Sequence, residues 1–199
     1  MIKRIIVIIQ KTIKPIRYII FMVIIEFKGF EKIGMDSCAI IMLANCPSNL
    51  EDFKEKFYTV KQALYHTATT HHEVIGVLVN KYYFDKEDAK DTWNKMIECL
   101  NLNLIYWHQN YKEDIEIRVR QANEEVVKES GDERLKIGEP DIKIISCFLY
   151  EGINKVYTLD RGFEKTCIKL GMTVLKLPRE YIIKSEEIKN MNKKIFEKK

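Results

Sequence analysis

Four acidic side chains stand where a fold of alternating strands and helices would bring them together. Asp36 and Asp160 each follow a predicted strand, while Glu73 and Asp141 each stand in the first turn of a predicted helix. In an open sheet of parallel strands, strand ends and helix starts share one edge, where such folds usually bind ligands. Mg²⁺ and Mn²⁺ prefer carboxylate oxygens as protein ligands. The four acids therefore predict a site for a divalent metal ion.

The chemistry of such a site follows from its charge. Four carboxylates in one cleft repel each other, which raises their pKa values unless a cation neutralises them. A bound Mg²⁺ or Mn²⁺ lowers the pKa of a water ligand and stabilises the charge that develops on a phosphate during in-line displacement. Hydrolysis of a phosphodiester by this route requires no nucleophilic side chain.

The elements that must position these acids alternate between strand-like and helix-like segments from residue 31 onward. This alternation predicts an α/β fold with a mainly parallel sheet and helices on both faces. Strands are expected near residues 31–36, 63–67, 103–107, 155–160 and 172–177. Helices are expected to begin at a capping box over residues 70–73, at Asp85, near residue 115, near residue 141 and near residue 163.

The predicted helix over residues 141–151 and the strand that follows it bring two of the acids together. A helix over residues 141–151 would be about 16 Å long at ~1.5 Å per residue. A strand over residues 155–160 would be about 20 Å long at ~3.3 Å per residue. Because this strand runs back along the helix, Asp160 is expected to end near Asp141.

Charge and cysteine content limit the class of protein. The net charge is +4, but residues 1–34 hold seven Lys and Arg against two Glu, so the remainder is close to neutral. Bulk charge therefore gives no support for nucleic-acid binding. The five cysteines are odd in number and include no CxxC pair, which argues against a zinc knuckle and against a disulfide framework. Reduced thiols and a cytoplasmic location are expected.

The two ends of the chain differ from the central domain, which we place at residues 31–178. Residues 1–30 are apolar and basic, but neither apolar run reaches the roughly 20 residues that a membrane-spanning helix needs. Three interpretations stay open: an extra strand or hairpin, a weak membrane-surface anchor, or an untranslated extension with the start at Met22 or Met35. Residues 179–199 form a Lys-rich tail that is expected to be helical.

Four stretches carry a family resemblance: residues 33–38 (Ile-Gly-Met-Asp-Ser-Cys), 72–75 (His-Glu-Val-Ile), 139–146 (Glu-Pro-Asp-Ile-Lys-Ile-Ile-Ser) and 156–163 (Val-Tyr-Thr-Leu-Asp-Arg-Gly-Phe). Together they resemble the PIN-domain family, which includes the VapC toxin ribonucleases. The resemblance covers most of residues 31–178. It implies a metal-dependent endoribonuclease that acts on RNA, single-stranded or structured, with a possible small antitoxin partner and a possible homodimer.

The resemblance also implies roles for individual residues. Asp36, Glu73, Asp141 and Asp160 match the acidic positions of the family, and Ser37 or Thr158 would support the metal shell. Independently of the resemblance, Arg161 beside Asp160 could meet a phosphate, with a solvated charge at the strand end as the default interpretation. Two positions depart from the family pattern: Cys38 replaces the amide that commonly follows Asp-Thr/Ser, and Gly162 stands where many members carry a further Asp.

Other interpretations of the same residues are open. Glu73 could serve only the capping box, Asp141 only the helix dipole and Asp160 only a turn. Trp93 and Trp107 are expected in the core, and the histidines, His108 among them, in ordinary polar roles. At the level of the whole chain, the alternatives are a non-catalytic PIN-like module that binds RNA or protein, and a membrane-surface protein anchored by residues 1–27. A membrane partner is not expected for the domain itself.

Overall fold

A computed structural model of the chain describes residues 30–59, 61–106 and 113–197. The chain divides into two units, residues 1–31 and residues 32–199. The predictions for the N-terminal extension, for Trp107 and for His108 lie outside the described residues. In the described part, no helix is both long enough and apolar enough to span a membrane.

Five strands form one sheet in the order β3-β2-β1-β4-β5. They are β1 (Glu31–Met35), β2 (Gln62–Thr67), β3 (Asn103–Ile105), β4 (Lys155–Tyr157) and β5 (Thr173–Leu175). The pairs β1–β4, β2–β3 and β4–β5 are parallel, with Met35 opposite Tyr157 and Thr67 opposite Ile105. The predicted α/β class with a mainly parallel sheet is confirmed.

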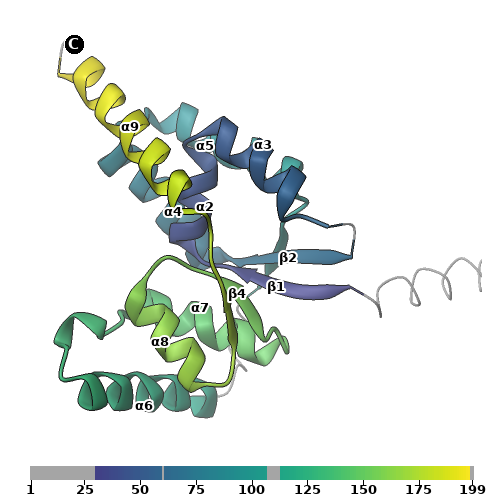
Figure 1. Ribbon diagram of the computed structural model, residues 1–199, viewed down its shortest axis with the longest axis vertical. Helices are drawn as coiled ribbons and strands as arrows, with labels where there is room; N and C mark the ends of the chain where they lie inside the picture. The colour runs from purple at the N-terminus through teal and green to yellow at the C-terminus, as the bar shows by residue number, and fades with distance from the viewer. Residues whose placement is uncertain (1–29, 60, 107–112, 198–199) are drawn as a thin grey trace, which may run out of the picture. The chain divides into compact units, whose positions relative to one another are not determined.

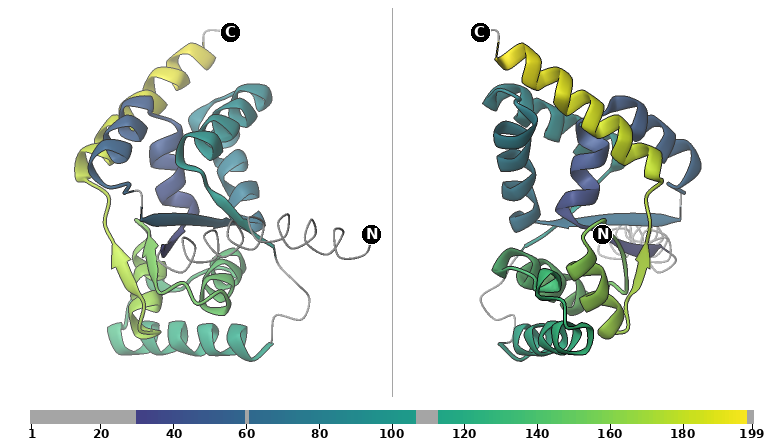
Figure 2. Two further views of the ribbon diagram at one scale, coloured as in Figure 1. Left: turned by 90° about the vertical axis from the view of Figure 1, so that its right-hand side faces the viewer. Right: turned by 60° about the vertical axis from the view of Figure 1, so that its left-hand side comes forward.

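Helices cover both faces of the sheet, as predicted (Figure 1). One layer holds α2 (Ser37–Ala44), α3 (Pro47–Lys56), α4 (Ala68–Tyr82), α5 (Lys86–Leu100) and α9 (Arg179–Phe196). The other layer holds α6 (Glu113–Ser130), α7 (Glu139–Tyr150) and α8 (Arg161–Lys169), with a short 3₁₀ helix over Glu133–Leu135. Figure 2 shows the two layers from two further sides.

Each layer has its own apolar core because side chains alternate between the faces of a strand. In β4, Tyr157 packs into the core of the α2 layer, and Val156 packs into the core of the α7 layer. In β1, Ile33 and Met35 face the α2 layer, so Gly34 faces α7. A Cβ added at Gly34 would lie 2.7 Å from the Phe148 ring, so only glycine allows this close approach of β1 and α7.

Several element boundaries differ from the sequence-based predictions, which also include neither α2 nor α3. The strand predicted over residues 155–160 is paired only over Lys155–Tyr157, and α8 begins at Arg161, before the predicted residue 163. The capping box predicted to begin at Thr70 is wrong. Thr67 at the end of β2 is the N-cap of α4, and its hydroxyl accepts a hydrogen bond from the Thr70 amide at 3.1 Å. Glu73 therefore stands in the second turn, so neither its predicted first-turn position nor a capping role applies.

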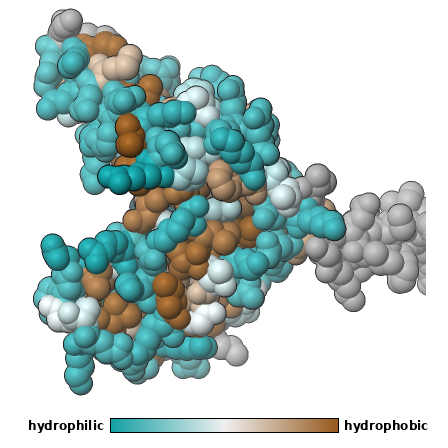
Figure 3. Space-filling model, in the orientation of Figure 1, coloured by the Kyte–Doolittle hydropathy of each residue, from teal (hydrophilic) through white to brown (hydrophobic). Residues whose placement is uncertain are grey.

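The helix after Pro178 is packed into the domain. Tyr181 and Ser185 of α9 are buried. The Asn45 side chain donates to the Ser185 hydroxyl at 2.7 Å, and the Asn49 side chain donates to the Tyr181 carbonyl at 3.0 Å. The predicted helical tail is thus fixed to α2 and α3 at its start. Its later turns expose apolar side chains, which Figure 3 shows along α9.

Candidate functional site

Asp36 lies at the centre of the candidate site, directly after β1, where it is the N-cap of α2. Its Oδ1 accepts from the Ser37 amide at 2.6 Å. Its Oδ2 accepts from the Thr158 hydroxyl at 2.8 Å and from the Cys38 thiol at 2.9 Å. The side chain is buried, and burial raises the pKa of the carboxyl although these hydrogen bonds oppose the rise.

Ser37 joins Asp36 to Glu73. The Ser37 hydroxyl lies 2.8 Å from Glu73 Oε2 and 3.2 Å from Asp36 Oδ1. Since a hydroxyl has one proton, it donates to one of the two carboxylates at a time, and the shorter contact favours Glu73. Burial raises the pKa of half-buried Glu73, the Ser37 hydrogen bond lowers it, and the charge of Asp36 raises it further.

Thr158 connects the end of β4 to the same centre. It is fully buried, donates to Asp36 Oδ2, and accepts from the Asp160 amide at 3.1 Å. Asp160 is the N-cap of α8, with its Oδ1 accepting from the Phe163 amide at 2.7 Å. Asp160 therefore caps a helix, which replaces the interpretation that it serves only a turn. Arg161 beside it is exposed, so its phosphate contact stays a prediction.

Asp141 stands in the first turn of α7, as predicted, and its Oδ2 accepts from the Gly138 amide at 3.2 Å. The pKa of this carboxyl is raised to about 7, first by burial and then by the charge of Asp36, with smaller contributions from Glu73 and Asp160. The hydrogen bond from Gly138 opposes this rise. A role in the helix dipole alone does not account for the charges of the other acids that raise this pKa. Asp141 thus lies within electrostatic reach of the other three acids.

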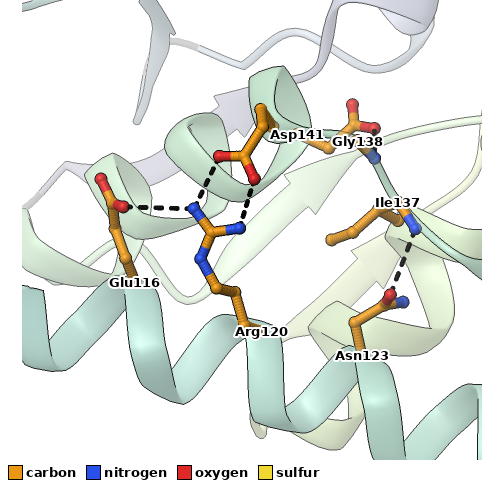
Figure 4. Close-up of polar contacts among 7 residues, drawn as sticks. Glu116, Arg120, Asn123, Ile137, Gly138 and Asp141 are labelled. Atoms are coloured by element: carbon orange, nitrogen blue, oxygen red, sulfur yellow. Dashed lines mark hydrogen bonds and ion pairs between the residues drawn. The ribbon is translucent and has the colours of Figure 1, made fainter.

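Helix α6 fixes the turn from which Asp141 projects (Figure 4). The Arg120 guanidinium forms two hydrogen bonds with the Glu139 carboxylate, one of them 2.6 Å long. One turn along α6, Asn123 accepts from the Ile137 amide at 3.2 Å and donates to the Leu135 carbonyl at 2.9 Å. These contacts hold the chain on both sides of Gly138, which sets the start of α7.

The donor set suits a hard cation, but its present arrangement is not a ligand sphere. Among the described residues, no three His, Cys, Asp or Glu side chains surround one point as metal ligands would. Both oxygens of Asp36 instead accept hydrogen bonds from protein donors. The nearby groups are carboxylates and hydroxyls, the oxygen ligands that Mg²⁺ and Mn²⁺ take. The chemical types fit these ions, and ligation would require the side chains to turn.

Cys38 takes part in the site in a way that the sequence does not predict. Its thiol donates to Asp36, and its sulfur accepts from the Leu159 amide at 3.0 Å. Burial and the charge of Asp36 raise the pKa of the thiol, which opposes formation of a thiolate nucleophile. Cys38 is therefore a hydrogen-bonding link between α2 and the end of β4. Its only signal in the sequence is its position two residues after Asp36.

His66 and His71 belong to an aromatic cluster around Trp93. Trp93 is buried, as predicted, and its ring contacts those of His66 and His71 at centroid distances of 5.0 and 4.7 Å. Burial lowers the pKa of His66 to about 4, so this imidazole is neutral at pH 7. These contacts give His66 and His71 a packing role.

The departure at Gly162 has a steric cause. A Cβ added there would lie 2.7 Å from the Leu135 carbonyl oxygen and 3.1 Å from Ile137 Cγ2. The Asp found at this position in many members of the resembled family would therefore displace the segment that Asn123 holds.

Gly162→Asp is expected to lower the free energy of unfolding by about 3 kcal/mol, because overpacked backbone must shift. Urea unfolding followed by circular dichroism measures it. Gly162→Ala should lose stability as well, since the clash begins at Cβ. Gly76→Ala is the matched control, because a Cβ at that helical glycine meets none of the described atoms within 4 Å. If Gly162→Asp leaves the urea midpoint of unfolding unchanged, the backbone around Leu135 shifts without loss of stability, and the prediction is wrong.

Solved structures of similar fold include two VapBC proteins. VapBC2 from Rickettsia felis, bound to a DNA fragment from its promoter, has 15% identity and a TM-score of 0.47, with 73% of this chain and 98% of that chain covered. VapBC-1 from nontypeable Haemophilus influenzae has 16% identity and a TM-score of 0.48, with 73% and 97% covered. No family model and no curated protein matches the chain.

Proposed function

We propose that this chain is a metal-dependent endoribonuclease of the PIN-like kind, which hydrolyses RNA phosphodiester bonds. The main support is the pKa of Asp141, which the charges of Asp36, Glu73 and Asp160 help to raise to about 7. Such repulsion is costly in a folded protein unless a cation relieves it. The four acids lie at the edge of the sheet where parallel α/β folds bind ligands.

The side chains divide the work between holding and orienting. Asp36, Glu73, Asp141 and Asp160 would hold Mg²⁺ or Mn²⁺, which when bound supplies an activated water and positive charge for the phosphate. Thr158 orients Asp36, and Ser37 orients Glu73. Arg161, which is exposed beside Asp160, would contact a phosphate of the substrate.

Cleavage of labelled single-stranded RNA by the purified chain tests the proposal. We expect cutting with Mn²⁺, none with EDTA, and about a hundredfold loss in Glu73→Gln, which removes one charge from the site. The control is Asp91→Asn, an exposed acid on α5, which should cut like the wild type. A folded wild-type chain that cuts no RNA with either metal would overturn the proposal.

One observation favours a second function, a non-catalytic PIN-like module that binds RNA or protein. Asp36 Oδ2 already accepts from both Cys38 and Thr158, and only 2% of the residue is exposed. An ion must displace these donors before it reaches the carboxylate. Calorimetry distinguishes the two functions: absence of Mn²⁺ binding by a folded chain that still binds RNA would establish the non-catalytic module.

The resemblance also suggests partners, an antitoxin-like protein and a second copy of the chain. Exposed Met191, Ile195 and Phe196 offer apolar surface near the end of α9. Light scattering of the purified chain measures self-association directly. Both partners and the cytoplasmic location stay predictions.

A further inference from the structure

A groove lined by residues of α2, α4 and α9 leads away from the acidic site. These three helices contact one another (Figure 1). The cavity volume of the groove is about 560 Å³. Ser37 and Glu73 line one end, Ile41 and Val77 line the middle, and Lys81 and Lys189 line the other end. We call it the α4 groove. It begins at two residues of the candidate site, so a polymer cut at the acids has a continuous path along it.

The direction of the groove follows the axis of α4. Glu73, Val77 and Lys81 are spaced four residues apart and therefore lie along one face of the helix. The rise from Glu73 to Lys81 is about 12 Å at ~1.5 Å per residue. An acidic end suited to a metal and a phosphate is thus joined to a basic end by an apolar middle.

Gly76 keeps the middle of the groove open. It lies inside α4, where glycine costs about 1 kcal/mol relative to alanine. A Cβ at Gly76 would meet no described atom within 4 Å, so no packing of the described chain requires glycine there. The space that glycine leaves is available to a ligand.

The basic end carries two amines. Lys81 is exposed and forms no ion pair with the described residues. Lys189 pairs with Glu186 at 3.1 Å, and its amine lies 5.7 Å from the centre of the Tyr82 ring. Glu186 also lines this end and offsets one of the two positive charges, so Lys81 carries the net positive charge that suits a phosphate.

We propose that the α4 groove binds the segment of single-stranded RNA next to the cleaved bond, with a base on the apolar floor over Gly76 and phosphates at Lys81 and Lys189. The inference rests on the proposed function, since the acids must act on a phosphate for this polymer to be RNA. The apolar side chains of Ile41 and Val77 can contact the face of any base, and lysines bind the backbone without reading its sequence.

Binding of fluorescein-labelled single-stranded RNA, measured by anisotropy in EDTA, tests the groove apart from cleavage. Gly76→Leu fills the floor and should weaken binding about tenfold, with no loss of thermal stability because leucine is a better helix former. Lys81→Ala should reduce the slope of log affinity against log salt by about 0.7. Asn94→Leu and Lys90→Ala, exposed positions on α5, are the matched controls and should bind like the wild type.

The outcomes separate this inference from the proposed function. If the wild type binds RNA but does not cut it, the proposed nuclease activity is wrong. The binding of the variants then decides whether the groove is an RNA site. Wild-type affinity in a folded Gly76→Leu chain would overturn the groove as an RNA site and leave it to a protein segment. A wild type that cuts RNA with Mn²⁺ but binds none in EDTA would overturn the groove alone, and a wild type that neither cuts nor binds would overturn both.

Discussion

Asp36→Asn is expected to reduce cleavage of single-stranded RNA by at least about a thousandfold, which corresponds to about 4 kcal/mol of transition-state stabilisation. Asp36 has the most interactions in the site: Ser37, Cys38 and Thr158 donate to it, and its charge raises the pKa values of Glu73 and Asp141. Removing this charge removes the ligand around which a cation would be centred. The rate is measured with labelled RNA and Mn²⁺.

The variant should remain folded, so that a loss of cleavage reports on chemistry. Asparagine keeps an oxygen for the Ser37 amide, which now donates to Oδ1 at 2.6 Å. The new amide group would face the hydroxyl of Thr158 and the thiol of Cys38, both of which can accept as well as donate. Burial raises the pKa of Asp36, so removing its charge should leave the melting temperature in EDTA equal or higher. Cleavage within tenfold of wild type would place the chemistry elsewhere.

The arrangement of the fold could be predicted from the sequence, but the ends of its elements could not. Alternating apolar segments predict a parallel sheet with two helical layers, because few other folds bury such a pattern. The predicted strand end at residue 160 is wrong. Beyond Tyr157, the Thr158 side chain donates to Asp36, and the Asp160 side chain caps α8. The Tyr181 carbonyl accepts a hydrogen bond from Asn49, more than a hundred residues earlier, and no local pattern carries that contact.

The acids of the candidate site illustrate the same limit. Strand ends and helix starts correctly indicate the edge where Asp36, Asp141 and Asp160 lie. Glu73 reaches it from the second turn of α4 because helical side chains lean toward the N-terminus. The role of Cys38 could not be predicted, since its partners Thr158 and Leu159 come from the far end of the domain.

Asp141→Asn is expected to stabilise the metal-free chain at pH 8 by about 2 kcal/mol. The pKa of Asp141 is about 7 in the folded chain against 3.8 ordinarily, so the folded state holds this proton more tightly than the unfolded state. Each unit of pKa difference corresponds to about 1.4 kcal/mol, and solvent screening of a half-buried group reduces the total. Asparagine carries no charge to bury and still accepts from the Gly138 amide.

The sign of the pH dependence follows from the two pKa values. Below pH 4 the carboxyl is protonated in both states, and its favourable contribution is complete. Between about pH 4 and 7 the unfolded state loses the proton first, so stability falls with rising pH until the folded carboxyl ionises near pH 7. The raised pKa values of Asp36 and Glu73 act in the same direction. His66 acts in the opposite direction because its pKa is lowered to about 4. The quantity to compare is therefore the difference between wild type and variant.

Urea unfolding at pH 5 and pH 8, in EDTA and with Mn²⁺, measures this difference. In EDTA the advantage of Asp141→Asn should be larger at pH 8 than at pH 5. With Mn²⁺ the wild type should gain more stability than the variant, because an ion that binds only the folded state stabilises it in proportion to its affinity. Asp91→Asn should show neither effect. A variant that gains as much from Mn²⁺ as the wild type would exclude Asp141 from the metal site, even if its effect at pH 8 in EDTA is as expected. The two halves of the experiment thus separate repulsion among the acids, which the structure already contains, from the metal binding that the proposed nuclease requires.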